Sequence, residues 1–204
     1  SFIGYSAAFP LLIKTQFPEV TANLAFLGAL VGSLARPLGG KLADKLGGTK
    51  VTMWTFLAMC AATTGVIHFV DAHSFVGFLV MFLVLFVTTG VGNGSTFRMI
   101  PVIFKNEKLE SVRGQGPEAR EAALKAARIE AAAVLGFVSA VGACGGYLIP
   151  SSFAASIKST GSAHGALVAF LCFYVTCIAV TWVFYARRKP AAEYTLSSVE
   201  EARV

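Results

Sequence analysis

Long apolar stretches separated by polar connections dominate this chain. Five of them reach the roughly 18–20 residues that an α-helix needs to cross a bilayer, and a shorter one comes first. The pattern predicts six helices: Ser1–Thr15, Ala22–Leu46, Thr49–Val70, Ser74–Phe104, Arg128–Ile157 and Ala163–Tyr185. The second, fourth and fifth exceed one crossing, so we expect their ends to project into the cytoplasm or to kink.

The first stretch is too short to span, because it reaches the polar residues Lys14-Thr-Gln within fourteen positions. A tilted or interfacial segment is one interpretation. The absence of an initiating Met and of a basic signal-peptide region favours another, in which the chain begins inside a truncated helix.

Composition and charge place the chain in a membrane. Hydrophobic residues make up 55%, charged residues 14%, and the mean hydropathy is +0.69, whereas soluble domains carry roughly 25% charged residues. The connections at 41–50, 105–128 and 187–203 carry thirteen of the seventeen basic residues. This asymmetry predicts that these connections and the C-terminus are cytoplasmic. The net charge of +6 then marks a membrane face and does not indicate nucleic-acid binding.

Arg36 is the only charge in the apolar run from Ala25 to Gly40, and every acidic residue lies outside the apolar part of the predicted helices. A charge at membrane depth costs several kcal/mol, and an unpaired guanidinium attracts an anion. Pro37 removes a helical donor for the carbonyl of Ser33 and predicts a bend beside the charge. Snorkelling of Arg36 to the interface is the alternative, but Lys41 and Lys45 already occupy that interface.

The remaining polar residues show no sign of catalysis. Four cysteines lie in apolar helices at no metal-ligand spacing: Cys60, Cys144, Cys172 and Cys177. Three histidines lie near outer helix ends, where we interpret them as interface residues: His68, His73 and His164. No Ser/His/Asp set, metal cluster or carboxylate pair is apparent. The sequence predicts no enzyme activity, cofactor or metal.

Glycines gather in the second, fourth and fifth helices. Tight helix packing explains this, and so does a moving central cavity lined by these three helices, with the third and sixth outside. The arrangement suits a transporter built from three-helix repeats. The stretch Gly90–Gly94 superficially suggests a phosphate loop, but no strand precedes it and the Walker Lys-Ser/Thr is absent.

The connection after the second helix reads Gly40-Lys-Leu-Ala-Asp44-Lys-Leu-Gly47, followed by basic residues. Its glycines permit a tight turn, and Asp44 can meet a helix N-terminus or a cytoplasmic basic group. The spacing resembles the loop motif of the major facilitator superfamily, in its second-half copy. The resemblance implies that Gly40, Asp44 and Gly47 belong to a gating loop.

Three segments together resemble the nitrate/nitrite porter family of that superfamily. They are Ser-Leu-Ala-Arg36, Gly92-Asn93-Gly94-Ser-Thr-Phe-Arg98-Met-Ile-Pro, and the stretch from Gly136 to Pro150. The resemblance implies an all-α, polytopic C-terminal half, with helices seven to twelve arranged as two three-helix inverted repeats. Residues 1–189 would be this half and residues 190–204 a disordered cytoplasmic tail.

The resemblance also implies residue roles. Arg36 matches the second-half substrate arginine, Ser139 is a candidate polar lining residue, and we expect Arg98 at the interface. Glycines for helix packing are Gly136, Gly142, Gly145 and Gly146 in the fifth helix, with Gly92, Asn93 and Gly94 in the fourth. The partner arginine and the aromatic residues that sandwich the anion would belong to missing upstream segments.

The resulting hypothesis is nitrate/nitrite transport across the cytoplasmic (inner) membrane by alternating access, with exchange favoured because two facing arginines repel unless an anion lies between them. Its partners would be the anion, the lipid bilayer and a missing N-terminal six-helix half. Nitrate/proton symport, a carrier for another small anion or a drug, and a non-transporting fragment remain alternatives.

Overall fold

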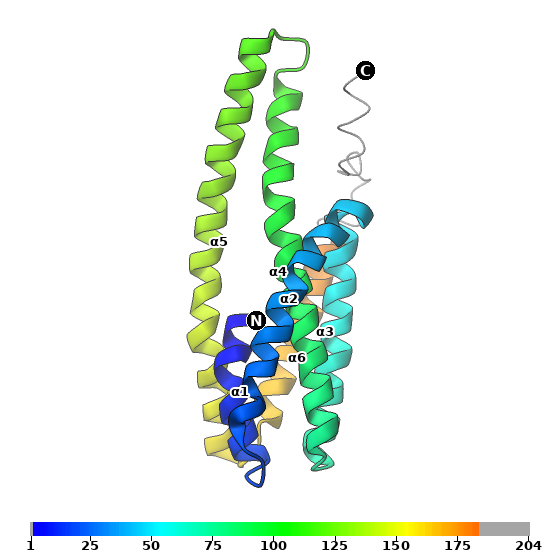
Figure 1. Cartoon of the computed structure of the whole chain (residues 1–204), viewed down its shortest axis with the longest axis vertical. Coiled ribbons are helices and arrows are strands. Elements are labelled where there is room, and N and C mark those ends of the chain that lie inside the picture. Colours follow the sequence, from blue (N-terminus) through cyan, green and yellow to red (C-terminus); the bar gives the residue numbers. More distant parts are fainter. Residues whose placement is uncertain (1, 184–204) are drawn as a thin grey trace.

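The computed structural model describes residues 2–183. It contains six α-helices and one short 3-10 helix, and no strand occurs in this part of the chain. In chain order the elements are α1 (Phe2–Gln16), η1 (Ala22–Leu24), α2 (Ala25–Leu46), α3 (Gly48–Asp71), α4 (Phe75–Ser111), α5 (Pro117–Thr160) and α6 (His164–Thr181). The predicted all-α class is confirmed. The helices run up and down the long axis of the molecule (Figure 1).

Five of these helices are long and apolar enough to cross a membrane: the segment Ala22–Leu46, and α3 to α6. Most predicted boundaries agree with the structure to within three residues. Residues 184 and 185 of the last predicted helix, and the predicted tail at 190–204, lie outside the described residues.

Two predicted boundaries are wrong, and both lie in the α4–α5 hairpin. α4 continues past Phe104 to Ser111, and α5 begins at Pro117 instead of Arg128. Hydropathy marks where an apolar span ends, whereas both helices continue because the two arms contact each other. The start of α5 is also rich in alanine, which favours helix. Buried alanines line this contact on α5, namely Ala123, Ala127 and Ala131.

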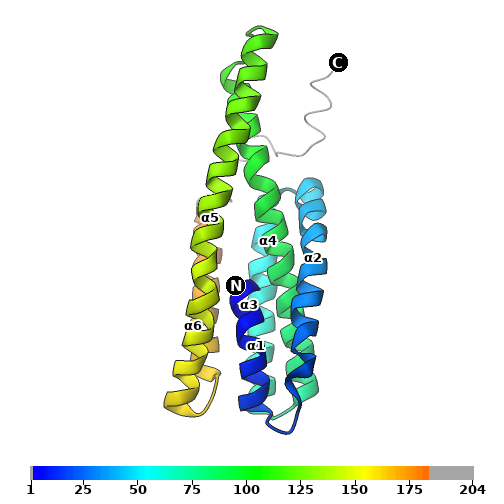
Figure 2. The same ribbon diagram turned by 60° about the vertical axis from the view of Figure 1, so that its left-hand side comes forward.

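The hairpin is also held by an ion pair between Lys108 Nζ and Glu130 Oε1 at 2.7 Å. At 1.5 Å per residue, the 37 residues of α4 and the 44 of α5 extend about 55 and 65 Å. A hydrocarbon core is only about 30 Å thick. The hairpin therefore projects well beyond the ends of the other helices (Figures 1 and 2).

The shortest helix, α1, is buried most completely. Its inward residues Tyr5, Ala8, Phe9, Leu12 and Ile13 are each at most 1% exposed. These residues are the centre of the apolar core, which α1 shares with α3, α4, α5 and α6.

Aromatic contacts join α1 to its neighbours. The ring of Phe9 stacks on that of Phe82 in α4, with centroids 4.5 Å apart and planes 4° from parallel. The hydroxyl groups of Tyr5 and Tyr174 are hydrogen-bonded to each other and join α1 to α6. Since a buried hydroxyl without a partner is costly, this pair satisfies two polar groups at once.

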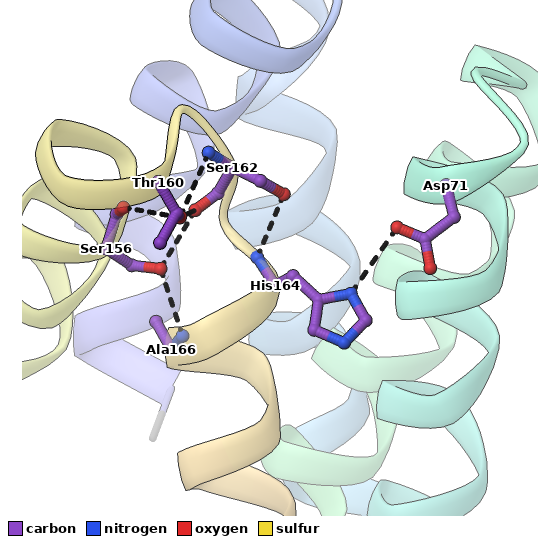
Figure 3. Close-up of polar contacts among 6 residues, drawn as sticks. All are labelled: Asp71, Ser156, Thr160, Ser162, His164 and Ala166. Carbon is purple, nitrogen blue, oxygen red and sulfur yellow. Dashed lines mark hydrogen bonds and ion pairs between the residues drawn. The ribbon is translucent and has the colours of Figure 1, made fainter.

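Polar contacts hold the turn between α5 and α6 and the start of α6 (Figure 3). The hydroxyl of Ser156 donates to the carbonyl of Ser162 at 2.8 Å and accepts from the backbone N–H of Ala166 at 3.3 Å. His164 Nδ1 lies 3.4 Å from Asp71 Oδ1 at the end of α3. The interface histidine predicted at position 164 therefore has an acidic partner.

Glycines bring the backbones of α2 and α4 into direct contact. A Cβ added to Gly39 would lie under 3.0 Å from the carbonyl oxygen of Val91, and one added to Gly90 under 3.0 Å from that of Gly32. Real Cβ atoms essentially never approach so closely. Small residues at contacts between membrane helices allow such close approach. The resulting van der Waals packing attracts the helices to each other, because lipid supplies no hydrophobic driving force between them.

This contact predicts a difference between two adjacent glycines. Gly39→Ala should lower the thermal stability of the protein in detergent, because the methyl group meets backbone atoms that cannot move aside. Gly40→Ala is the matched control, since its nearest atom would lie 3.9 Å away. Thermal unfolding of both variants tests this, and equal melting temperatures would contradict the contact.

Candidate functional site

Arg36 lies on α2 against the first helix of the chain. Its guanidinium carbon Cζ is 4.2 Å from the centroid of the Phe2 ring, a cation–π contact. The side chain is half-buried. Its Nε atom is buried and has no hydrogen-bond partner among the described residues. The charge is thus held by an aromatic face and keeps an unused donor, which suits it to bind an anion.

The backbone of Arg36 is positioned by α4. A Cβ added to Gly94 would lie under 3.0 Å from both the carbonyl oxygen and the carbonyl carbon of Arg36. Gly92, two residues earlier, is turned toward α3, where a Cβ would lie 2.8 Å from Thr55 Cγ2. Between them Asn93 is half-buried. The alternating glycines of α4 therefore serve two neighbours, and Gly94 sets how closely α4 approaches the arginine.

Asp44 of α2 and Arg98 of α4 form an ion pair farther along the same two helices. Arg98 Nε donates to Asp44 Oδ1 at 3.1 Å and lies 3.2 Å from Oδ2. Asp44 is in the last turn of α2, and its side chain is 24% exposed against 53% for Arg98. The structure therefore gives Asp44 a basic partner, which is one of the two kinds of partner that the sequence allowed, and it gives Arg98 a definite partner.

The other two residues of the predicted gating loop have different surroundings. A Cβ added to Gly40 would lie 3.9 Å from the Cβ of Arg98. Gly47 separates α2 from α3 and has a backbone φ of 86°, which residues other than glycine rarely adopt. The connection is thus a one-residue break between two helices, and Asp44 lies within a helix.

The predicted residues of α5 lie apart from this group. The Ser139 hydroxyl is exposed and donates to the carbonyl of Leu135 at 2.6 Å in its own helix. Added Cβ atoms at Gly136, Gly142 and Gly145 would meet nothing within 4 Å, and one at Gly146 would meet only Ile3 Cγ2 at 3.1 Å. Figure 2 shows α5 and α2 on opposite sides of the bundle. Their roles at the site stay predictions.

Sequence reasoning missed Phe2 and the Arg98 partner of Asp44. The only available signal for Phe2 was the four-residue spacing of Gly28, Gly32 and Arg36. This spacing places two positions without side chains and one charge on the same face of the helix. No local pattern identifies which ring fills such a gap, since Phe2 is 34 positions from Arg36.

The Asp44–Arg98 pair predicts the effect of a charge swap. Asp44→Arg should lower the melting temperature by placing two cations together, and the double variant with Arg98→Asp should recover part of the loss. Because the pair is partly exposed, we expect about 1 kcal/mol or less of coupling. A double variant whose loss equals the sum of the single losses would contradict direct pairing.

The fold and its apolar helices define an all-α polytopic membrane protein. No family model matches the chain. It is 46% identical to the nitrate/nitrite transporter NarU of Salmonella typhimurium and 45% identical to NarU of Escherichia coli, over 93% of this chain and 42% of each relative. It is 32% identical to the probable nitrate/nitrite antiporter NarK2 of Thermus thermophilus, over 92% of this chain and 39% of that protein.

These similarities support the family inferred from the motifs: over more than nine tenths of its length the chain is similar to proteins named as nitrate/nitrite transporters. It spans about two fifths of the length of the relatives it matches. Those relatives are named as transporters and not as enzymes.

Proposed function

We propose that this chain is the C-terminal six-helix half of a major facilitator transporter that exchanges nitrate and nitrite across the cytoplasmic membrane, with Arg36 as an anion ligand. The observation that carries the proposal is the buried Nε of Arg36, which has no partner among the described residues. An unsatisfied buried donor is costly, and a planar oxyanion matches the donor geometry of a guanidinium.

A missing N-terminal half is supported by two observations. The relatives are more than twice as long as this chain. In addition, the middle of α5 has large apolar side chains without cover, with Phe137 72% and Tyr147 75% exposed. Its open glycines beside them suit close contact with another helix. The second substrate arginine would come from that half.

Alternating access follows from charge. Two facing arginines in a low-dielectric site repel each other, and an anion between them offsets the repulsion so that the halves can close. An empty site resists closure, which couples the movement of one anion to the return of another. The basic end of the bundle, with Lys41, Lys45 and the α4–α5 hairpin, would be the cytoplasmic end.

The Asp44–Arg98 pair has a place in this cycle as a latch. It joins the ends of α2 and α4, the helix pair that carries Arg36. A movement of α2 along α4 would have to break this pair, so the pair would favour one of the two access states. Its partial exposure keeps the cost of breaking it small enough for a transport cycle.

Counterflow in proteoliposomes tests the proposal. In the full-length protein that contains this chain, Arg36→Lys should lower nitrate/nitrite exchange at least about tenfold, because Lys retains the charge but loses the planar fork of donors. Arg128→Lys is the matched control, since Arg128 is exposed in the α5 projection. Both variants must be inserted and folded to equal extents.

Three outcomes bear on the alternatives. Unchanged exchange in Arg36→Lys would contradict the proposed anion site. Exchange that requires a pH gradient and acidifies the lumen would indicate nitrate/proton symport. Counterflow driven equally well by formate or chloride would indicate a carrier for other small anions.

A further inference from the structure

One face of α2 carries Gly28, Gly32 and Arg36 at four-residue intervals. Each glycine accommodates an aromatic ring from another helix. A Cβ added to Gly28 would lie under 3.0 Å from the ring of Phe86, and one added to Gly32 under 3.0 Å from the ring of Phe2. The two rings therefore occupy the space of absent side chains, in the two turns directly before the arginine.

The two rings also hold each other. Phe2 and Phe86 meet edge to face, with centroids 6.0 Å apart and planes at 81°. Phe86 is 1% exposed and contacts Phe9, at 5.5 Å between centroids. Phe2 is thus fixed by Gly32 on one side and by the buried core through Phe86 on another. Its face is left to the guanidinium of Arg36, at 4.2 Å.

The chemistry of this contact differs from that of an ion pair. A carboxylate beside Arg36 would hold the guanidinium but would neutralise it and take up its N–H donors. An aromatic face attracts the cation through its quadrupole and accepts no conventional hydrogen bond from it. A ring face therefore takes up none of the guanidinium's N–H donors, and the Nε donor of Arg36 has no partner among the described residues. An anion site needs this combination of a fixed cation and free donors.

We propose that Phe2, seated on Gly32 and Phe86, is a positioning residue that orients Arg36 for a small planar oxyanion. This inference rests on the proposed role of Arg36 as an anion ligand. Phe2 acts through the arginine: it reduces the side-chain freedom that Arg36 would otherwise lose on binding, which is a cost of up to about 2 kcal/mol for a long side chain. Removing the ring should therefore weaken binding of the anion more than it slows movement of the helices.

The test compares Phe2→Leu, Phe2→Tyr and Phe170→Leu in the full-length transporter. Phe170→Leu is the matched control, because Phe170 is also half-buried and also makes edge-to-face contacts, with Tyr5 and Phe153 instead of Arg36. KM and maximal rate for nitrate counterflow are measured for each variant, together with the melting temperature.

We expect Phe2→Leu to raise KM about three- to tenfold, as the loss of one cation–π contact implies, with the maximal rate changed less than about twofold. Phe2→Tyr keeps a ring and should have a KM close to that of the wild type. Phe170→Leu should leave KM unchanged even if it lowers the melting temperature. Equal KM values for Phe2→Leu and Phe170→Leu would overturn the proposal. So would a KM for Phe2→Tyr that is as high as the KM for Phe2→Leu.

Gly32→Ala gives a second route if Phe2→Leu does not fold. It leaves Phe2 in the chain but places a methyl group where its ring lies, so KM should rise in the same direction, and an unchanged KM would count against the proposal. The two hypotheses separate cleanly. If Arg36→Lys leaves exchange intact, the anion site itself fails. If Arg36→Lys abolishes exchange while Phe2→Leu and Gly32→Ala leave KM unchanged, only the positioning role fails.

Discussion

The direct backbone contact between α2 and α4 is the constraint on which the rest of this structure depends. Four glycines, Gly32, Gly39, Gly90 and Gly94, allow the two helices to meet without intervening side chains. Lipid supplies no hydrophobic force between helices, so close van der Waals contact is the main attraction available. Because Gly94 contacts the backbone of Arg36, the same contact that joins the helices also determines where the one intramembrane charge of α2 lies.

That charge is stabilised without being neutralised. Burial of a guanidinium is expensive, and most proteins offset the cost with a carboxylate. Here the described residues offer Arg36 an aromatic face instead, and the carboxylate of α2 lies two turns farther on, where Asp44 pairs with Arg98. One helix pair thus keeps a cation available in its middle and an ion pair at its end. This separation is what an anion carrier with a latch would require.

α1 and α5 differ most in how far the rest of the bundle covers them. α1 lies in the core with almost no exposed surface on its inner face, so it contributes the centre of the packing. α5, in contrast, presents glycines and large apolar side chains without cover, although it is the longest helix. A helix of this kind is stable in lipid because its backbone is satisfied internally, and it offers a surface for another helical unit.

The sequence by itself determined the number of apolar spans, the distribution of basic residues among the connections and the lack of an acidic residue beside Arg36. These properties are local: hydropathy, charge and helix periodicity depend only on neighbouring positions. Its motifs also carry the resemblance to the nitrate/nitrite porters, which the similar proteins support, because the arginine segment and the glycine stretches are specific in combination.

Only the tertiary structure decided which groups meet. Phe2 lies over Arg36, and Arg98 pairs with Asp44 across 54 positions. A Cβ added to Gly94 would meet the backbone of Arg36, whereas one added to Gly142 would meet nothing within 4 Å. The glycines of α4 and α5 look alike in the sequence, because a missing side chain does not specify what fills its place. The predicted spans left out residues 105–111 of α4 and 117–127 of α5 for the same reason, since these polar segments form a hairpin only when the two arms pack together, where Lys108 pairs with Glu130.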